Sequence, residues 1–169
     1  GTCLNRGCIP SKMLIYPADF IHLCRRAGRI DLDLPQLPRA RFPELAKRVN
    51  QRVAQISQDI ESAVRHTPRL SLIQGEARLC GERCVAAGDR IISADQLFLA
   101  VGTRPARPGI PGLAATPYMT SREALQNTQL PRRMIVIGAG YCACELGHAY
   151  GSFGCETHFM VRSCPLRRE

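Results

Sequence analysis

The chain has 169 residues, of which 45% are hydrophobic and 22% are charged, so its composition is that of an ordinary globular protein. The length excludes a large multidomain assembly and allows one domain, or parts of two, at roughly 100–200 residues per domain. The formal net charge of +9 favours either a nucleic-acid surface or phosphate-bearing ligands. Because only 5% of the residues are aromatic and the arginines are scattered, small phosphorylated molecules are the better hypothesis.

The compartment is predicted from the cysteines and from the apolar segments. No apolar run approaches the roughly 18 residues of a membrane-spanning helix, and the first residues lack the pattern of a secretory signal. The nine cysteines are an odd number, which favours catalytic or incidental thiols over a disulfide framework. We therefore expect a cytoplasmic protein with no membrane or nucleic-acid partner. Since the chain begins without Met and ends just after a predicted strand, we also expect a fragment.

Two helices are predicted in the first half of the chain. The first covers the apolar-rich residues 13–24, with Pro10 in its first turn and Gly28 beyond its end. The second begins near Pro43 and Glu44 and ends near Pro68. Its apolar residues recur at spacings of three and four, at Phe42, Leu45, Val49, Val53, Ile56, Ile60 and Val64. One such stripe predicts packing against a core more often than a coiled coil.

The second half predicts a small sheet followed by a parallel unit. Short β-prone segments lie at 70–73, 84–86, 90–92 and 96–101, and a Pro- and Gly-rich connection follows at 104–112. Residues 134–137 then predict a strand, 141–153 a helix and 156–162 a second strand. This order is the opening of a βαβ unit, so the predicted fold class is α/β.

Cys3 and Cys8 are the first candidate reactive groups. Four residues separate them, and they lie just before and within the first turn of the predicted helix. The positive end of the helix dipole lowers the pKa of a thiol there and favours the nucleophilic thiolate. Lys12 follows Cys8 by one helical turn on the same face. The alternative is two unrelated buried thiols. Zinc is not expected, since no second Cys or His pair has suitable spacing nearby.

Residues 1–12, GTCLNRGCIPSK, resemble the redox-active disulfide motif of the flavin-dependent pyridine nucleotide-disulfide oxidoreductases. That family includes dihydrolipoamide dehydrogenase and glutathione, mycothione and mercuric reductases. The resemblance implies that Cys3 exchanges with a disulfide substrate, that Cys8 contacts the flavin, and that Thr2 and Lys12 contribute to the flavin site. Arg6 departs from the motif, where a small apolar residue is commoner.

Two further segments are similar to the family's FAD site. Residues 97–105 with 110–112 resemble the strand and turn that close over FAD, although Val101 replaces the usual Thr. Residues 75–77 resemble a short segment at which the backbone approaches the flavin nucleotide. The resemblance implies FAD-binding roles for Gly75, Ala77, Ala100, Gly102 and Thr103.

Gly138 and Gly140 predict a nicotinamide-nucleotide site. They follow a strand and open a helix, with Ala143 in the third glycine position, so a pyrophosphate would lie against the helix N-terminus. In the family, the aromatic residue at Tyr141 lies between the nicotinamide site and the flavin, and Glu145 is its neighbour in the helix.

The end of the second predicted strand indicates which nicotinamide coenzyme binds. An acid that binds the ribose of NAD usually stands there, about 20 residues after the glycines. This chain has Arg162 instead, and Arg168 follows. Guanidinium groups suit the 2′-phosphate of NADP, although an exposed basic turn is the alternative.

The resemblance implies a partial FAD-binding domain at 1–117 and the start of an NAD(P)-binding domain at 118–169, both Rossmann-like. The expected cofactors are FAD and NADP, or NAD. The expected partners are a small-molecule or lipoyl-type disulfide and, in the full-length protein, a second copy. Leu4 and residues 9–12 favour a dihydrolipoamide dehydrogenase, which is the main prediction. Arg162 favours the alternative, an NADPH-dependent glutathione, mycothione or mercuric reductase. A non-catalytic fragment of such an enzyme is the third hypothesis.

Overall fold

A computed structural model of the chain describes residues 1–162, 164 and 166. They form two compact units, Gly1–Ser57 with Pro105–Glu169 and Gln58–Arg104, each of which is described by itself. No helix in the described part of the chain is both long and apolar enough to span a bilayer. The boundary predicted between an FAD-binding domain at 1–117 and an NAD(P)-binding domain at 118–169 separates two cofactor sites, and it stays a prediction.

The first unit is mostly helical. The predicted helices over 13–24 and 141–153 are confirmed, as is the helix that begins at Phe42. Two short helices, α1 and α4, are additional. The elements of this unit are α1 (Thr2–Arg6), α2 (Cys8–Arg25), η1 (Ala27–Ile30), the first part of α3 (Phe42–His66), η2 (Leu113–Ala115), α4 (Ser121–Gln126), β4 (Arg133–Ile137), α5 (Tyr141–Phe153) and β5 (Glu156–Met160).

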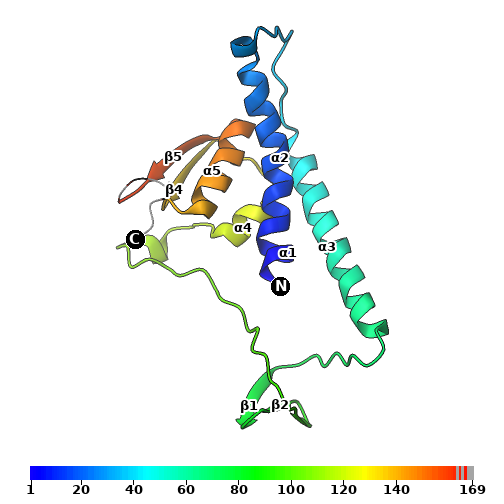
Figure 1. Ribbon diagram of the computed structural model, residues 1–169. Helices are drawn as coiled ribbons and strands as arrows, with labels where there is room; N and C mark the ends of the chain where they lie inside the picture. The colour runs from blue at the N-terminus through cyan, green and yellow to red at the C-terminus, as the bar shows by residue number, and fades with distance from the viewer. Residues whose placement is uncertain (163, 165, 167–169) are drawn as a thin grey trace. The chain divides into compact units, whose positions relative to one another are not determined.

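Strands β4 and β5 pair in parallel, from Arg133 opposite Glu156 to Ile137 opposite Met160, and α5 connects them. The predicted βαβ order is therefore confirmed, although β5 ends two residues before the predicted end at residue 162. Helix α5 packs between this sheet and α2 (Figure 1). Gly147 permits the close approach, because a Cβ atom there would overlap the ring of Phe159 on β5.

The core of this unit lies where α2, α3 and α5 meet. Its largest fully buried side chains are Tyr150, Leu14 and Val49. The ring of Phe42 lies 5.4 Å from that of Tyr150. The predicted apolar stripe on α3 is buried only over its first turns, where Phe42, Leu45, Ala46 and Val49 lie. Ile60, further along the stripe, is 51% exposed.

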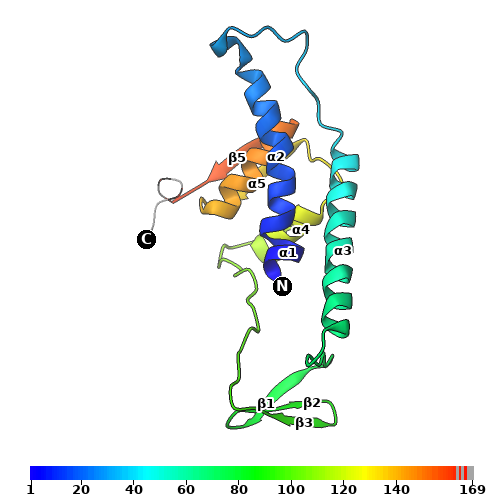
Figure 2. The same cartoon turned by 45° about the vertical axis from the view of Figure 1, so that its right-hand side comes forward.

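The second unit contains a three-stranded antiparallel sheet of β1 (Ala77–Gly81), β2 (Cys84–Ala87) and β3 (Arg90–Ser93) (Figure 2). The strands predicted at 84–86 and 90–92 are confirmed. Those predicted at 70–73 and 96–101 are wrong, because the described residues there pair with no neighbouring strand. A β-prone segment without a partner does not form a stable strand. Phe98 and Val101 are accordingly 85% and 89% exposed.

Candidate functional site

Cys3 and Cys8 lie beside each other at the junction of α1 and α2. Cys8 is the first residue of α2, and Gly7 connects the two helices. A Cβ atom on Gly7 would lie 3.0 Å from the carbonyl oxygen of Thr2, so this position favours a residue without a side chain. Both cysteines are exposed free thiols. The junction therefore presents two neighbouring sulfur atoms to solvent.

The hydrogen bond between the two thiols raises the pKa of Cys3 above its ordinary value. The bond has this effect because it stabilises the protonated form, and a negative charge on Cys8 would act in the same direction. The net shift of the Cys3 pKa is therefore upward, opposite to the lowering expected from the helix end. In the reduced pair, Cys3 retains its proton to higher pH than an isolated cysteine does.

Polar contacts join α2 to α5 at three successive levels. Lys12 forms an ion pair with Glu145. Further along, Asp19 Oδ1 lies 2.8 Å from His148 Nε2. Still further along, the guanidinium of Arg25 donates a hydrogen bond of 2.9 Å to the carbonyl oxygen of Ser152. From one contact to the next, the residue number increases on both helices. Helices α2 and α5 therefore run in the same direction (Figure 1).

The parallel arrangement places the N-termini of α2 and α5 at the same end of the helix pair. Tyr141, the first residue of α5, is 73% exposed. Its pKa is raised chiefly by the nearby thiol of Cys142, with smaller contributions from Cys8 and Glu145. Tyr141 thus lies within electrostatic reach of the thiol pair. Five residues that the sequence predicts for the thiol, flavin and nicotinamide sites gather at this end: Cys3, Cys8, Lys12, Tyr141 and Glu145.

The turn between β4 and α5 fits a phosphate group. Gly138 has a φ of 119°, a left-handed conformation that favours glycine, and its N–H donates to the carbonyl oxygen of Met160 at 3.0 Å. Gly140 caps α5, and no side chain of the described residues accepts a hydrogen bond at that cap. Space around both glycines is open, and Ala143 is half-buried in the first turn. The helix N–H groups would therefore be available to a pyrophosphate.

The remaining predicted residues have separate places. Thr2 begins α1, and Arg162 follows β5 by two residues. Arg168 lies outside the described residues. The residues predicted to bind FAD in the second unit are all exposed, and their role stays a prediction: Gly75, Ala77, Ala100, Gly102 and Thr103.

Some features of the first unit were not predicted. Cys142 received no role from the sequence, and no sequence signal identified the contact between Asp19 and His148.

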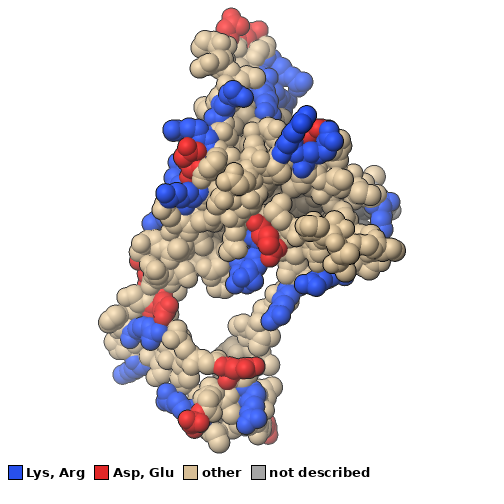
Figure 3. Space-filling view, turned by 180° about the vertical axis from the view of Figure 1, so that it is seen from behind, with Lys and Arg blue, Asp and Glu red and all other residues tan. Residues whose placement is uncertain are grey.

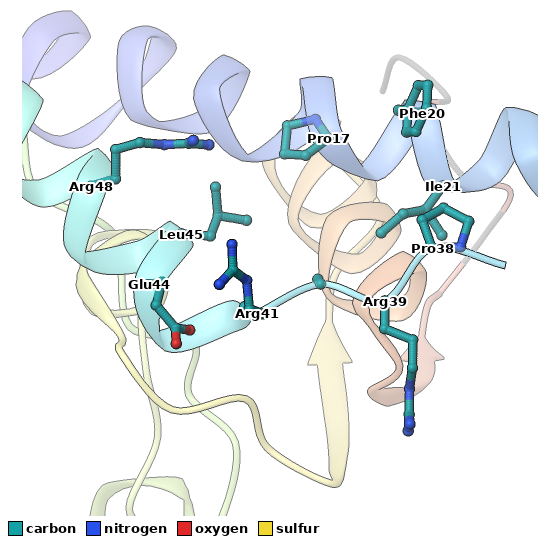
Figure 4. A pocket seen from close by; sticks show the side chains of 10 residues that line it. Pro17, Phe20, Ile21, Pro38, Arg39, Arg41, Glu44, Leu45 and Arg48 are labelled. Carbon is teal, nitrogen blue, oxygen red and sulfur yellow. The ribbon is translucent and has the colours of Figure 1, made fainter. Parts of the chain in front are cut away.

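A groove of about 350 Å³ lies beside α2 and the start of α3. Arg41 and Arg48 point into it, whereas Arg39 points away (Figure 4).

On one face of the molecule, the basic residues form separate groups (Figure 3). On the face drawn in Figure 3, Lys and Arg are interspersed with Asp and Glu rather than gathered in one stripe. This distribution agrees with the scattered arginines of the sequence.

Comparison with known proteins identifies the family. The model of the family described as "Pyridine nucleotide-disulphide oxidoreductase" matches residues 1–168. The chain belongs to this family. Pyridine nucleotide-disulphide oxidoreductases bind FAD and a nicotinamide coenzyme in general.

Within the family, the chain is similar to mercuric reductases. It is 34% identical to that of Shigella flexneri over 178 residues, which cover 100% of this chain and 31% of the relative. The mercuric reductase of Acidithiobacillus ferrooxidans is also 34% identical, with 100% of this chain and 32% of the relative covered. The chain therefore spans about a third of the length of these relatives.

A solved structure of the family shares the fold. The HOCl-induced flavoprotein disulfide reductase RclA from Escherichia coli, in its Cu(II) complex, matches with a TM-score of 0.77 and 24% identity. The match covers 95% of this chain and 33% of that protein. It supports a mixed α/β fold like that of part of a flavoprotein reductase.

Proposed function

We propose that these residues belong to an FAD-dependent reductase that uses NADPH and passes electrons through Cys3 and Cys8 to Hg(II). The observation that carries the proposal is the exposed thiol pair, which lies at the same end of α2 and α5 as the glycine turn. Soft metal ions prefer thiolate ligands. The two mercuric reductases with 34% identity over the whole chain support this substrate.

The chain's own residues have distinct roles in this proposal. Cys3 would meet the substrate, as the family resemblance implies, since it is exposed and lies in α1, outside α2. Cys8 would receive electrons, and a bound FAD would supply the redox chemistry that connects NADPH with the thiols. Lys12 and Glu145 would hold the two helix ends together beside the thiols. Tyr141 would cover the nicotinamide side of the site, because it begins α5 and is exposed there.

Residues around α5 would determine whether the protein prefers NADPH or NADH. The turn at Gly138 and Gly140 would hold the pyrophosphate through helix N–H groups, and Ala143 would leave room for close packing. Arg162 would bind the 2′-phosphate, because a guanidinium forms strong charge-assisted hydrogen bonds with a phosphate. Dihydrolipoamide dehydrogenase, which the active-site motif favours, has less support, because the relatives named above are mercuric reductases.

The test begins with purified protein that is mixed with FAD, desalted and examined by visible absorption. We expect retained flavin that anaerobic NADPH bleaches more readily than NADH does. Hg(II) should then accelerate NADPH oxidation, and a Cys3→Ser/Cys8→Ser variant should retain flavin but lose this acceleration.

Each alternative gives a different result in the same experiment. Reduction of NAD by dihydrolipoamide without a response to Hg(II) would indicate the dehydrogenase. Acceleration by glutathione disulfide alone would indicate a disulfide reductase. A colourless protein would contradict the proposal for this chain and support the non-catalytic fragment.

A further inference from the structure

The second unit contains the β1–β2 hairpin (Figure 2). This hairpin carries a second pair of thiols, Cys80 and Cys84. The sulfur atoms of Cys80 and Cys84 are 3.0 Å apart. The side chain of Cys80 is exposed and that of Cys84 is half-buried, and neither sulfur is engaged in a disulfide. Neither residue has a role in the function proposed above.

The register of the hairpin explains why these sulfur atoms meet. Ala77 pairs with Ala87 and Leu79 with Val85, so the next pair in this register would be Cys80 with Cys84. The register then shifts by one residue, and Gly81 also lies opposite Cys84. Two residues of β1 thus oppose one residue of β2, which is the arrangement of a β-bulge.

The turn holds the two strands in this register. Glu82 and Arg83 connect them, and Arg83 adopts a φ of 51°. The Arg83 side chain donates a hydrogen bond of 3.1 Å to the carbonyl oxygen of Asp95, and its own carbonyl accepts one of 3.2 Å from the N–H of Ala94. Gly81 brings no side chain between the thiols. The sulfur contact is therefore built into the backbone of the hairpin.

The environment distinguishes the two thiols chemically. The hydrogen bond with Cys80 raises the pKa of Cys84, so Cys84 keeps its proton to higher pH. Cys80 is the more exposed of the two and is open to an incoming reagent. These properties favour attack by Cys80, followed by resolution by Cys84.

We propose that Cys80 and Cys84 form a second redox couple, separate from Cys3 and Cys8, that low-molecular-weight disulfides such as glutathione disulfide oxidise. In the first step, the Cys80 thiolate attacks glutathione disulfide, whose S–S bond breaks as a mixed disulfide forms and one glutathione leaves. In the second step, Cys84 attacks the Cys80 sulfur and releases the second glutathione. The protein thiols lose two electrons, and the two released thiols carry the two electrons and the two protons.

Peptide mapping tests this couple directly, because trypsin cleaves between the two cysteines after Arg83. Cleavage after Arg78, Arg83 and Arg90 places Cys80 in LCGER and Cys84 in CVAAGDR. The full chain, carrying Cys3→Ser and Cys8→Ser, is treated with glutathione disulfide, alkylated and digested. We expect a disulfide to join the two peptides, so that the mass of the product is lower than the sum of their masses by two hydrogen atoms. Cys84→Ser should instead leave a stable glutathione adduct on Cys80.

A matched control moves the first thiol by one residue with Leu79→Cys and Cys80→Ser. Successive side chains of a strand point to opposite faces, so a thiol at 79 faces away from Cys84. The joined peptides should form roughly tenfold more slowly or worse in this variant, and likewise in the Cys3→Ser/Cys8→Ser chain unfolded in urea, because the hairpin no longer aligns the sulfur atoms. Equal rates in native and urea-unfolded chain, or separately modified Cys80 and Cys84 in the native chain, would overturn the proposal.

Discussion

The side chains of Lys12 and Glu145 form an ion pair between α2 and α5, although they are 133 positions apart in the chain. Lys12 follows Cys8 by one helical turn, and Glu145 lies one turn after Tyr141, the first residue of α5. The pair therefore joins the predicted thiol site to the predicted nucleotide site. Two motifs that are remote in sequence become neighbours because their helices pack in parallel.

The Lys12–Glu145 ion pair should contribute little to stability. The Lys12 side chain is 61% exposed and that of Glu145 is 32% exposed. Solvent screens such a pair, so a double-mutant cycle with Lys12→Met and Glu145→Gln should give a coupling of about 0.2–1 kcal/mol. Urea denaturation of the four proteins measures it. A coupling above about 3 kcal/mol would mean that the pair is effectively buried.

The reactivity of Cys3 should depend on Cys8. Because their hydrogen bond raises the pKa of Cys3, Cys8→Ala should shift the pH profile of Cys3 alkylation by iodoacetamide to lower pH. Mass spectrometry of the peptide that carries Cys3 follows the reaction. Cys24→Ala is the control, since Cys24 lies at the opposite end of α2 and should leave the profile unchanged. An unshifted profile in Cys8→Ala would contradict the thiol contact.

Tyr150 should be an important polar anchor of the core. It is fully buried, and its hydroxyl donates a hydrogen bond of 2.7 Å to the carbonyl oxygen of Ala124 in α4. Tyr150→Phe leaves that carbonyl without this donor and should lower the free energy of unfolding by about 1–3 kcal/mol. Urea denaturation checks this value. Tyr118→Phe is a control on a partly exposed tyrosine and should have little effect.

Because Tyr150 is buried, the free energy of unfolding should also depend on pH in the alkaline range. Desolvation raises the pKa of Tyr150 above its ordinary value of about 10. Below pH 10 the phenol is neutral in both folded and unfolded chains, so its contribution is fully present. As the pH rises further, the unfolded chain ionises first and the free energy of unfolding falls. Tyr150→Phe should lack this part of the alkaline decline, as denaturation at several pH values would show.

Two glycines of α5 should respond oppositely to substitution by alanine. A Cβ atom at Gly147 would overlap the ring of Phe159, so Gly147→Ala should destabilise the fold by about 1–3 kcal/mol. At Gly151, the nearest atom would be the Thr157 hydroxyl oxygen at an ordinary 3.6 Å. Gly151→Ala should gain up to about 1 kcal/mol of helix propensity. Thermal denaturation compares them, and equal effects would refute the packing of α5 on β5.

Periodicity and motifs in the sequence determined the main elements of the first unit. The spacing of apolar residues predicted α3, the glycine turn predicted the β4–α5–β5 order, and residues 1–12 indicated the thiol pair and the family. These features are local, because each depends on neighbouring residues or on one helical period. Two predicted strands at 70–73 and 96–101 failed for the converse reason. A strand needs a partner, and β-prone residues do not specify one.

Packing between distant parts of the chain determines which of these local features lie together. Parallel packing of α2 and α5 brings Lys12 to Glu145, and no pattern within either helix specifies that contact. The contact between Cys80 and Cys84 depends on the register of β1 against β2, which the turn between the two strands holds. The raised pKa of Cys3 likewise depends on a hydrogen bond between thiols, which outweighs the expected effect of the helix end. The sequence determined which groups can react, and packing decided which of them meet.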